Sequence, residues 1–264
     1  MNQVQAAATR LTPEAGKIKE AVRTSPVIGS DETGARVNGD NHWEWVFQTP
    51  EASYHTIETS RSAKVIEEML AGAEPEVWNS DCLGAQMKTS ANAHQLCTSH
   101  QLRDLQYPID AEECPWSKEM KALFQRAIHL HHQRSTPTDP SDLSPADFQE
   151  QVQQIEDACD ALLREEVASK DGQRLQRRYV KHRGALFVFL HRSDVSPDNN
   201  ASERDLRPSV MHRKVTGGFR SEWGPKSFAT LTTVVQTAKK RGQNLFQAIQ
   251  ASLSPPLPSA RSPR

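Results

Sequence analysis

The sequence contains no long apolar run, and no stretch approaches the ~20 consecutive apolar residues that a membrane-spanning helix requires. The N-terminus also lacks an apolar segment followed by small residues, the pattern of a secretory signal. These absences predict a cytoplasmic protein with no membrane partner. The hydrophobic fraction of 36% and the mean hydropathy of −0.69 are typical of a polar, soluble chain that still builds a core.

Cysteine is scarce, and the four residues Cys82, Cys97, Cys114 and Cys159 show no disulfide-framework spacing. In a reducing compartment such residues are expected as free thiols. Cys97 and His100 supply only half of a zinc site, so packing or backbone bonding explains them better than a metal. The chain also lacks a glycine-rich phosphate-binding motif, which argues against an ATP-driven function.

The net charge of −1 gives no overall attraction to nucleic acid, but the basic residues are clustered. The segment 174–183 contains five Lys or Arg residues and no acid, and the segment 204–220 contains five against a single acid, Asp205. Such clusters can present a basic face to phosphate groups. An ordinary solvated helix surface is the alternative interpretation.

Strand signals dominate the first hundred residues. Strands are predicted at 27–33, 42–47, 53–59, 77–80 and 94–97, with turn residues at 38–40 and a helix at 62–71. Helical spacing follows, and we read residues from about 115 to 185 as a helical insertion interrupted by a loop at 135–142. This order predicts an α/β fold of the ribonuclease H type, a mixed sheet flanked by helices.

The ends of the chain and its last helices complete the predicted organisation. Residues 1–25 are predicted to contain a frayed start and one short helix, which Thr12 caps and Pro13 begins. Residues 26–252 are predicted to form the main domain, and residues 253–264 a disordered tail. A short helix at 198–207 ends at Pro208, and residues 211–215 form a strand or extended segment. The last helix covers 225–241 before Gly242. Its predicted buried stripe consists of Phe228, Leu231, Val235 and Ala238.

Three acidic residues stand where strands end or helices begin. Phosphoryl transfer on DNA needs two divalent ions held by converging oxygen ligands, which carboxylates supply. Asp31 lies in an apolar strand beside Glu32, and only one of the two can face a given site because strand side chains alternate. We choose Asp31 for its shorter, more rigid side chain. Asp81 ends a short apolar strand, and Glu203 lies near the start of a helix.

Each acid also has a structural interpretation. Asp31 is compatible with an edge strand that faces solvent, and Asp81 with a turn before Gly84. Glu203 is compatible with a capping box in which Asn200 caps the helix, or with an i,i+4 pair to Arg207.

Taken in order, several short motifs resemble the catalytic region of transposases of the insertion sequence 66 family. The motifs are Asp31-Glu32-Thr33, Asn79-Ser80-Asp81, Cys97-Thr98-Ser99-His100, Asn199-Asn200-Ala201-Ser202-Glu203-Arg204 with Leu206-Arg207-Pro208, and Gly218-Phe219-Arg220-Ser221. The resemblance extends from about residue 15 to 250 and is most specific between 187 and 242. The long N-terminal region that family members usually carry does not precede these motifs in this chain.

The resemblance implies a ribonuclease H-like fold with a helical insertion before the third acid. It implies that Asp31, Asp81 and Glu203 are the catalytic residues and hold two Mg²⁺ or Mn²⁺ ions for DNA cleavage and strand transfer. Basic residues near Glu203 are then expected to hold the DNA backbone, namely Arg204, Arg207, Arg213, Lys214 and Arg220. The expected partners are element ends and target DNA, further copies of the chain and accessory element-encoded proteins, in a bacterial cytoplasm at the nucleoid. The alternative is a truncated, non-catalytic remnant or regulator.

Overall fold

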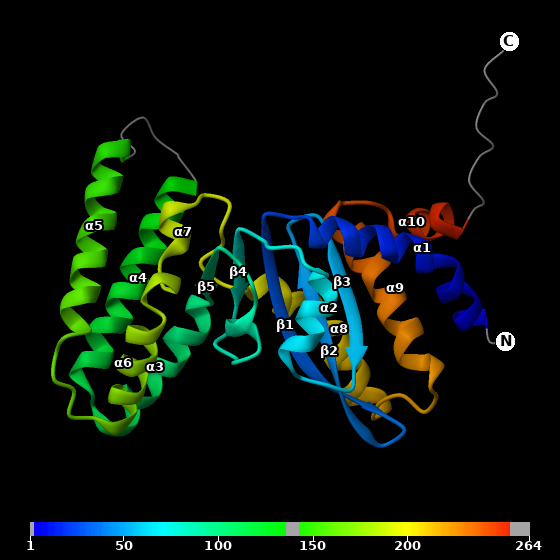
Figure 1. Ribbon diagram of the computed structural model, residues 1–264, viewed down its shortest axis with the longest axis horizontal. Coiled ribbons are helices and arrows are strands. Elements are labelled where there is room, and N and C mark those ends of the chain that lie inside the picture. The colour runs from blue at the N-terminus through cyan, green and yellow to red at the C-terminus, as the bar shows by residue number, and fades with distance from the viewer. Residues whose placement is uncertain (1–2, 136–142, 254–264) are drawn as a thin grey trace, which may run out of the picture. The chain divides into compact units, whose positions relative to one another are not determined.

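The computed structural model describes residues 3–135 and 143–253 (Figure 1). The chain divides into two compact units, residues 1–73 with 202–264, and residues 74–201. Strands pair antiparallel in the first unit and parallel in the second, which confirms a mixed α/β protein. Residues 136–142 of the predicted loop and 254–264 of the predicted tail lie outside the described residues.

The first unit contains three strands and their covering helices. Its elements are α1 (Gln3–Arg23), β1 (Val27–Val37), β2 (Asp40–Gln48), β3 (Ser53–Glu58), α2 (Ala63–Leu70), α8 (Asn200–Thr216), α9 (Trp223–Lys240) and α10 (Leu245–Leu253). Asn38 and Gly39 form the predicted turn between β1 and β2, where Val37 pairs with Asp40. Both turn residues have positive φ angles, 51° and 93°, as a two-residue hairpin requires.

Helix α9 covers the outer edge of this antiparallel sheet. The backbone N–H groups of Ser53 and His55 on β3 donate to the hydroxyl oxygens of Thr237 and Thr233, at 3.0 and 2.9 Å. Four residues along a helix rise about 6 Å, close to the rise of two residues along a strand, so the two threonines match alternate strand residues. The edge strand therefore has hydrogen-bond partners from a helix in place of another strand.

The second unit joins two parallel strands to a bundle of helices. Its elements are β4 (Val77–Ser80), η1 (Gln86–Lys88), β5 (Ala93–Leu96), α3 (Thr98–Glu112), α4 (Pro115–Ser135), α5 (Pro145–Leu162), α6 (Lys170–Lys181), η2 (Arg183–Ala185) and α7 (Val188–His191). Aromatic rings fill the bundle, with Phe124 in contact with both Tyr179 and Phe187 at centroid distances of 5.6 and 5.4 Å. All three side chains are fully buried, so this unit has an apolar core of its own.

The first helix is longer than predicted. It begins at Gln3, and Pro13 lies inside it, so the predicted cap at Thr12 is wrong. The Thr12 hydroxyl instead donates to the carbonyl of Ala8, one turn earlier in the same helix. Packing against α9 and β3 explains the extra length, because Leu11, Ile18 and other apolar residues of α1 are buried.

Helix α8 continues through Pro208, so the predicted stop and the predicted extended segment at 211–215 are both wrong. Proline cannot donate to the carbonyl four residues earlier and normally kinks or ends a helix. Contacts beyond the proline hold this helix in place: Ser209 donates to Glu44 of β2, and Arg213 donates to the Gly34 carbonyl of β1.

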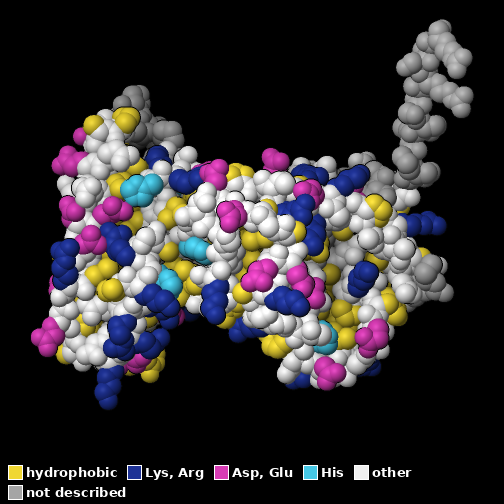
Figure 2. All heavy atoms as spheres, viewed as in Figure 1, with side chains coloured by type: hydrophobic (Ala, Val, Ile, Leu, Met, Phe, Trp, Pro, Cys, Tyr) yellow, Lys and Arg dark blue, Asp and Glu magenta, His cyan; other side chains and the backbone are white. Residues whose placement is uncertain are grey.

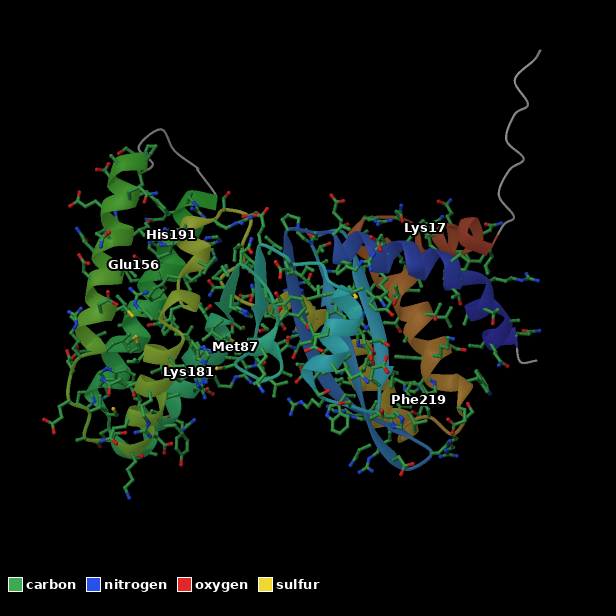
Figure 3. The ribbon with its side chains drawn as sticks, viewed as in Figure 1. Lys17, Met87, Glu156, Lys181, His191 and Phe219 are labelled. Carbon is green, nitrogen blue, oxygen red and sulfur yellow. The ribbon has the colours of Figure 1, made fainter. Side chains whose placement is uncertain are left out.

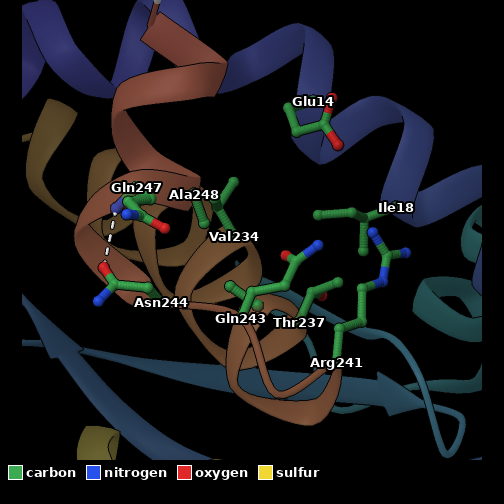
Figure 4. A pocket seen from close by; sticks show the side chains of 10 residues that line it. Glu14, Ile18, Val234, Thr237, Arg241, Gln243, Asn244, Gln247 and Ala248 are labelled. Atoms are coloured by element: carbon green, nitrogen blue, oxygen red, sulfur yellow. Dashed lines mark hydrogen bonds between the residues drawn. The ribbon is translucent and has the colours of Figure 1, made fainter.

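The C-terminal part of the first unit also differs from the prediction. Of the predicted stripe on α9, only Ala238 is buried, and the buried side includes Thr233, Val234 and Thr237. Gly242 ends this helix as predicted, with a φ of 63°. Helix α10 follows unpredicted, and Asn244 Oδ1 accepts the Gln247 N–H at 3.1 Å at its start (Figure 4).

A cavity of about 520 Å³ lies between α1, α9 and α10 (Figure 4). Its lining includes Glu14, Arg241 and amide side chains, and none of the three candidate acids. Across the described part of the chain, no helix is long and apolar enough to cross a membrane.

Candidate active site

Asp31 lies in the middle of β1, on the opposite face from its neighbour Glu32. Glu32 is buried, and its Oε1 accepts hydrogen bonds from Arg61 Nε and Nη2 at 2.9 and 2.6 Å. Asp31 is half-buried, and its Oδ1 accepts the Glu32 N–H at 2.9 Å. Strand alternation places Asp31 on the same face as Thr33. Arg213 of α8 contacts Thr33, so Asp31 shares the sheet face on which α8 packs.

Glu203 lies in the first turn of α8 and is half-buried. The predicted cap differs in detail, because Asn200 is the first helical residue. Its N–H and its side-chain amide donate to the two carboxylate oxygens of Asp198, at 3.0 and 2.7 Å. Within the first unit, helix α8 therefore carries Glu203 and packs on the face of the sheet that bears Asp31.

Asp81 directly follows β4 in the second unit and is half-buried. Its Oδ1 accepts the Leu83 N–H at 2.9 Å, which is the turn geometry expected of an Asp at this position. This hydrogen bond fixes the orientation of the carboxylate. A turn-forming role and a metal-ligand role are therefore compatible at Asp81.

The segment that leads into α8 is tied to the ends of β4 and β5 within the second unit. The Asn79 side-chain amide donates to the carbonyls of Ser196 and Asp198, at 2.9 and 3.1 Å. The Asn199 N–H donates to Cys97 Sγ at 3.2 Å. Residues at the ends of β4 and β5 thus hold the segment 196–199 in place within the second unit.

These contacts explain Cys97 without a metal. The thiol is fully buried, and burial raises its pKa, while the hydrogen bond from the Asn199 backbone lowers it. Backbone bonding was the role that the spacing favoured. Within neither unit do the described residues include a group of three or more His, Cys, Asp or Glu side chains arranged to hold a metal ion.

Two cationic residues of α6 lie close enough to Cys82, the residue after Asp81, for their charges to act on its thiol. Burial raises the pKa of the Cys82 thiol, the charges of Arg178 and Lys181 lower it, and the charge of Asp81 raises it. Arg178 also pairs with Asp104 of α3. Arg178 and Lys181 therefore act on the thiol that directly follows the second acid in the chain.

The same helix carries a basic stripe, which we define as Lys170, Arg174, Arg177 and Lys181. All four side chains are exposed, and their spacing of three or four residues places them on one side of α6. Figure 2 shows Lys and Arg side chains gathered over this helix, and Figure 3 labels Lys181 at its C-terminal end. Three of these residues belong to the basic cluster at 174–183 that the sequence shows, and their helical spacing indicates the shared side.

The five predicted DNA contacts after Glu203 differ in exposure. Arg204, Arg207, Lys214 and Arg220 are exposed. Arg213 is half-buried, and its Nη1 donates to the Gly34 carbonyl and to Thr33 Oγ1, the latter at 3.4 Å. Arg213 therefore helps to hold α8 on the sheet.

These features describe a mixed α/β protein with acids at a strand centre, a strand end and a helix start, beside exposed basic residues. The family described as Transposase IS66 family matches residues 1–227, and the chain belongs to this family.

The chain is also similar to a curated protein of Sinorhizobium fredii named "Uncharacterized protein y4jO". The two are 36% identical over 77 residues, which is 29% of this chain and 24% of that relative. The match thus spans about a quarter of the relative's length, and its name states no activity.

Proposed function

We propose that this chain is the catalytic domain of a transposase that cuts DNA at the ends of an insertion sequence and joins the freed strand to target DNA. The observation that supports this most directly is the placement of Glu203 on α8. In the first unit this helix packs on the sheet face bearing Asp31, and in the second unit the residues leading into it are bonded to Asn79 and Cys97. Family membership supports the same conclusion.

In this proposal Asp31, Asp81 and Glu203 hold two Mg²⁺ or Mn²⁺ ions. The donor set suits such ions, because all three side chains are carboxylates and these cations prefer oxygen ligands. When bound, the ions supply Lewis-acid activation of the attacking oxygen and neutralise charge on the phosphate. The Glu32 N–H orients Asp31, and the Leu83 N–H orients Asp81. Pre-oriented ligands reduce the reorganisation that the transition state requires.

The exposed basic residues hold the DNA backbone in this proposal. Arg204, Arg207, Lys214 and Arg220 follow Glu203 in the sequence, and the charge of Lys181 acts on Cys82 beside Asp81. Arg213 contributes by holding α8 on the sheet. We further propose a ribonuclease H-like arrangement in which the helices from α4 to α6 are an insertion before the third acid. Assembly of several copies on DNA at the nucleoid, with accessory element-encoded proteins, belongs to the same proposal. The match over residues 1–227 does not favour the non-catalytic alternative.

The test is Mg²⁺- or Mn²⁺-dependent cleavage of labelled DNA that carries the neighbouring element ends. Glu203→Gln keeps the side-chain shape and removes the charge, so we expect cleavage to fall by at least about 100-fold. The matched control is Glu67→Gln, an exposed glutamate on α2, which should cleave as the parent does.

Circular dichroism and thermal unfolding of all three proteins will show whether each is folded. Equal cleavage by Glu203→Gln and the parent would remove Glu203 from the mechanism. A folded parent that never cleaves would contradict the proposed activity for this chain.

A further inference from the structure

Two adjoining hollows are lined by residues of the loop that connects α8 to α9. The larger, about 530 Å³, is lined by aromatic rings of His212, Phe219, Trp223 and Phe228. The His212 and Phe219 rings stack with centroids 4.8 Å apart, and Phe219 meets Phe228 edge-on at 5.4 Å. Figure 3 labels Phe219 at this site. The rings are half-buried, so aromatic surface remains accessible.

The smaller hollow, about 380 Å³, is basic. Arg36 and Arg220 line it, together with Asn38 and the backbone of the loop, and no acid is among its described lining residues. Both guanidinium side chains are on exposed residues. Arg36 Nη1 donates to the Gly39 carbonyl at 2.9 Å, and Asn38 donates to Glu222. The two hollows share Thr216, Gly218, Phe219 and Arg220, so they adjoin each other.

The loop between the hollows is firmly held. The Phe219 N–H donates to the Arg36 carbonyl and the Asn38 N–H donates to the Phe219 carbonyl, both at 2.8 Å. Gly218 has a φ of 125°, and a Cβ there would lie 2.6 Å from the Arg36 carbonyl oxygen. This close approach requires glycine and fixes Phe219 and Arg220 relative to the β1–β2 hairpin.

We propose that the two hollows together bind one unpaired nucleotide of DNA. Its base stacks on the aromatic rings, and its phosphate lies near Arg36 and Arg220. An apolar hollow alone would bind an apolar side chain equally well. The two adjoining guanidinium groups favour an occupant that carries an anion beside its aromatic group. A nucleotide joins these two groups through one sugar. A base inside a duplex is already stacked and paired, so the occupant must be unpaired.

This inference rests on the proposed function for its DNA, but it requires no metal ion and no cleavage. The experiment measures binding of the full chain, in EDTA, to a duplex with a short single-stranded extension that carries 2-aminopurine. Binding should quench the 2-aminopurine fluorescence through stacking. An extension with an abasic site at that position should bind about fivefold or more weakly.

Variants of Trp223 test whether the base binds in the aromatic hollow. Trp223→Ala should weaken binding of the base-containing extension by the same factor and leave binding of the abasic DNA unchanged. Trp223→Phe, which keeps an aromatic ring, should bind nearly as the parent does. Tyr107→Ala is the matched control, because Tyr107 is an exposed aromatic residue of α3 in the other unit.

Four results would overturn the proposal. Equal affinity for base-containing and abasic DNA, or no binding of either, would remove the stacking site. Competition by a free deoxynucleoside monophosphate at concentrations near the Kd of the DNA would assign the hollows to a free nucleotide. A change of oligomeric state in Trp223→Ala would identify them as a protein contact. Metal-dependent cleavage lost in Glu203→Gln would leave the proposed function standing in each case.

Discussion

At the residue scale, an ion pair between Lys240 and Asp205 connects α9 to α8. The Lys240 Nζ lies 3.0 Å from Asp205 Oδ2, and the two side chains are only 13% and 10% exposed. Lys240 also donates to Gln48 Oε1 and to the Thr49 carbonyl at the end of β2. Burial lowers the pKa of Lys240, and the charge of Asp205 raises it. The lowered pKa indicates that the cost of burial exceeds the attraction between the partners.

Replacement of one member of this ion pair should therefore lower the free energy of unfolding more than replacement of both. We expect Lys240→Met to lower the free energy of unfolding by about 3 kcal/mol, because a partly buried carboxylate is left unpaired. Lys240→Met combined with Asp205→Asn should recover part of this loss. Urea denaturation measures all three values, with the exposed neighbour Lys239→Met as the control. Similar stability of Lys240→Met and Lys239→Met would show that the pair has no such role.

At the element scale, buried polar contacts decide the position of α8. The Ser209 hydroxyl donates to Glu44 Oε1 at 2.6 Å, and His55 Nδ1 lies 3.0 Å from the same oxygen. His55 Nε2 in turn lies 3.1 Å from Ser53 Oγ. All four residues are buried. This network, together with Arg213, holds the part of α8 that follows Pro208 on the sheet, and α8 also carries Glu203.

We predict that Ser209→Ala lowers the free energy of unfolding by about 1–2 kcal/mol, because a buried carboxylate loses a donor. If Glu203 acts as proposed, cleavage should also fall roughly tenfold or more, since small displacements of a catalytic group are costly. Thermal unfolding and the cleavage assay measure the two effects. Thr230→Ala is the control, because that hydroxyl donates to the Lys226 carbonyl of the same helix, α9. Unchanged stability and cleavage in Ser209→Ala would contradict the role given to the network.

At the scale of the whole molecule, charge placement matters more than net charge. The chain has a net charge of −1, yet the basic stripe on α6 and the exposed residues Arg204, Arg207, Lys214 and Arg220 provide cationic surface. Phosphate contacts release counterions, so their number sets the salt dependence of DNA binding. If α6 contacts DNA, the basic stripe therefore contributes measurably to the salt dependence of DNA binding.

We expect the double variant Arg177→Ala/Lys181→Ala to bind all DNA sequences more weakly. The logarithm of the binding constant falls linearly with the logarithm of the salt concentration, and this slope should become less steep by about 2. That change corresponds to two lost phosphate contacts. Fluorescence anisotropy over a series of salt concentrations measures this slope. The matched control is Lys118→Ala/Arg126→Ala, which changes two exposed basic residues of α4. An unchanged slope in the stripe variant would exclude α6 from the DNA interface.

Local patterns in the sequence determined much of the fold of this protein. The predicted strands overlap all five observed strands, the Asn38-Gly39 turn forms the hairpin, and Gly242 ends α9. Alternation and turn chemistry act between near neighbours, so they can be read without knowledge of distant contacts. The order of acidic motifs likewise indicated the family, which the match to residues 1–227 confirms.

Tertiary structure decided the features that depend on distant partners. Helix α8 passes Pro208 because Ser209 and Arg213 bond to strands far away in sequence. The buried side of α9 includes Thr233 and Thr237 because an edge strand supplies N–H groups to their hydroxyls. Glu32 bonds to Arg61 on one face of the sheet, so Asp31 lies on the opposite face, where α8 packs. Strand alternation alone did not decide which of the two acids faces α8. In each case long-range hydrogen bonds outweigh local propensity, because an unpaired buried polar group costs more than a residue in an unfavourable local position.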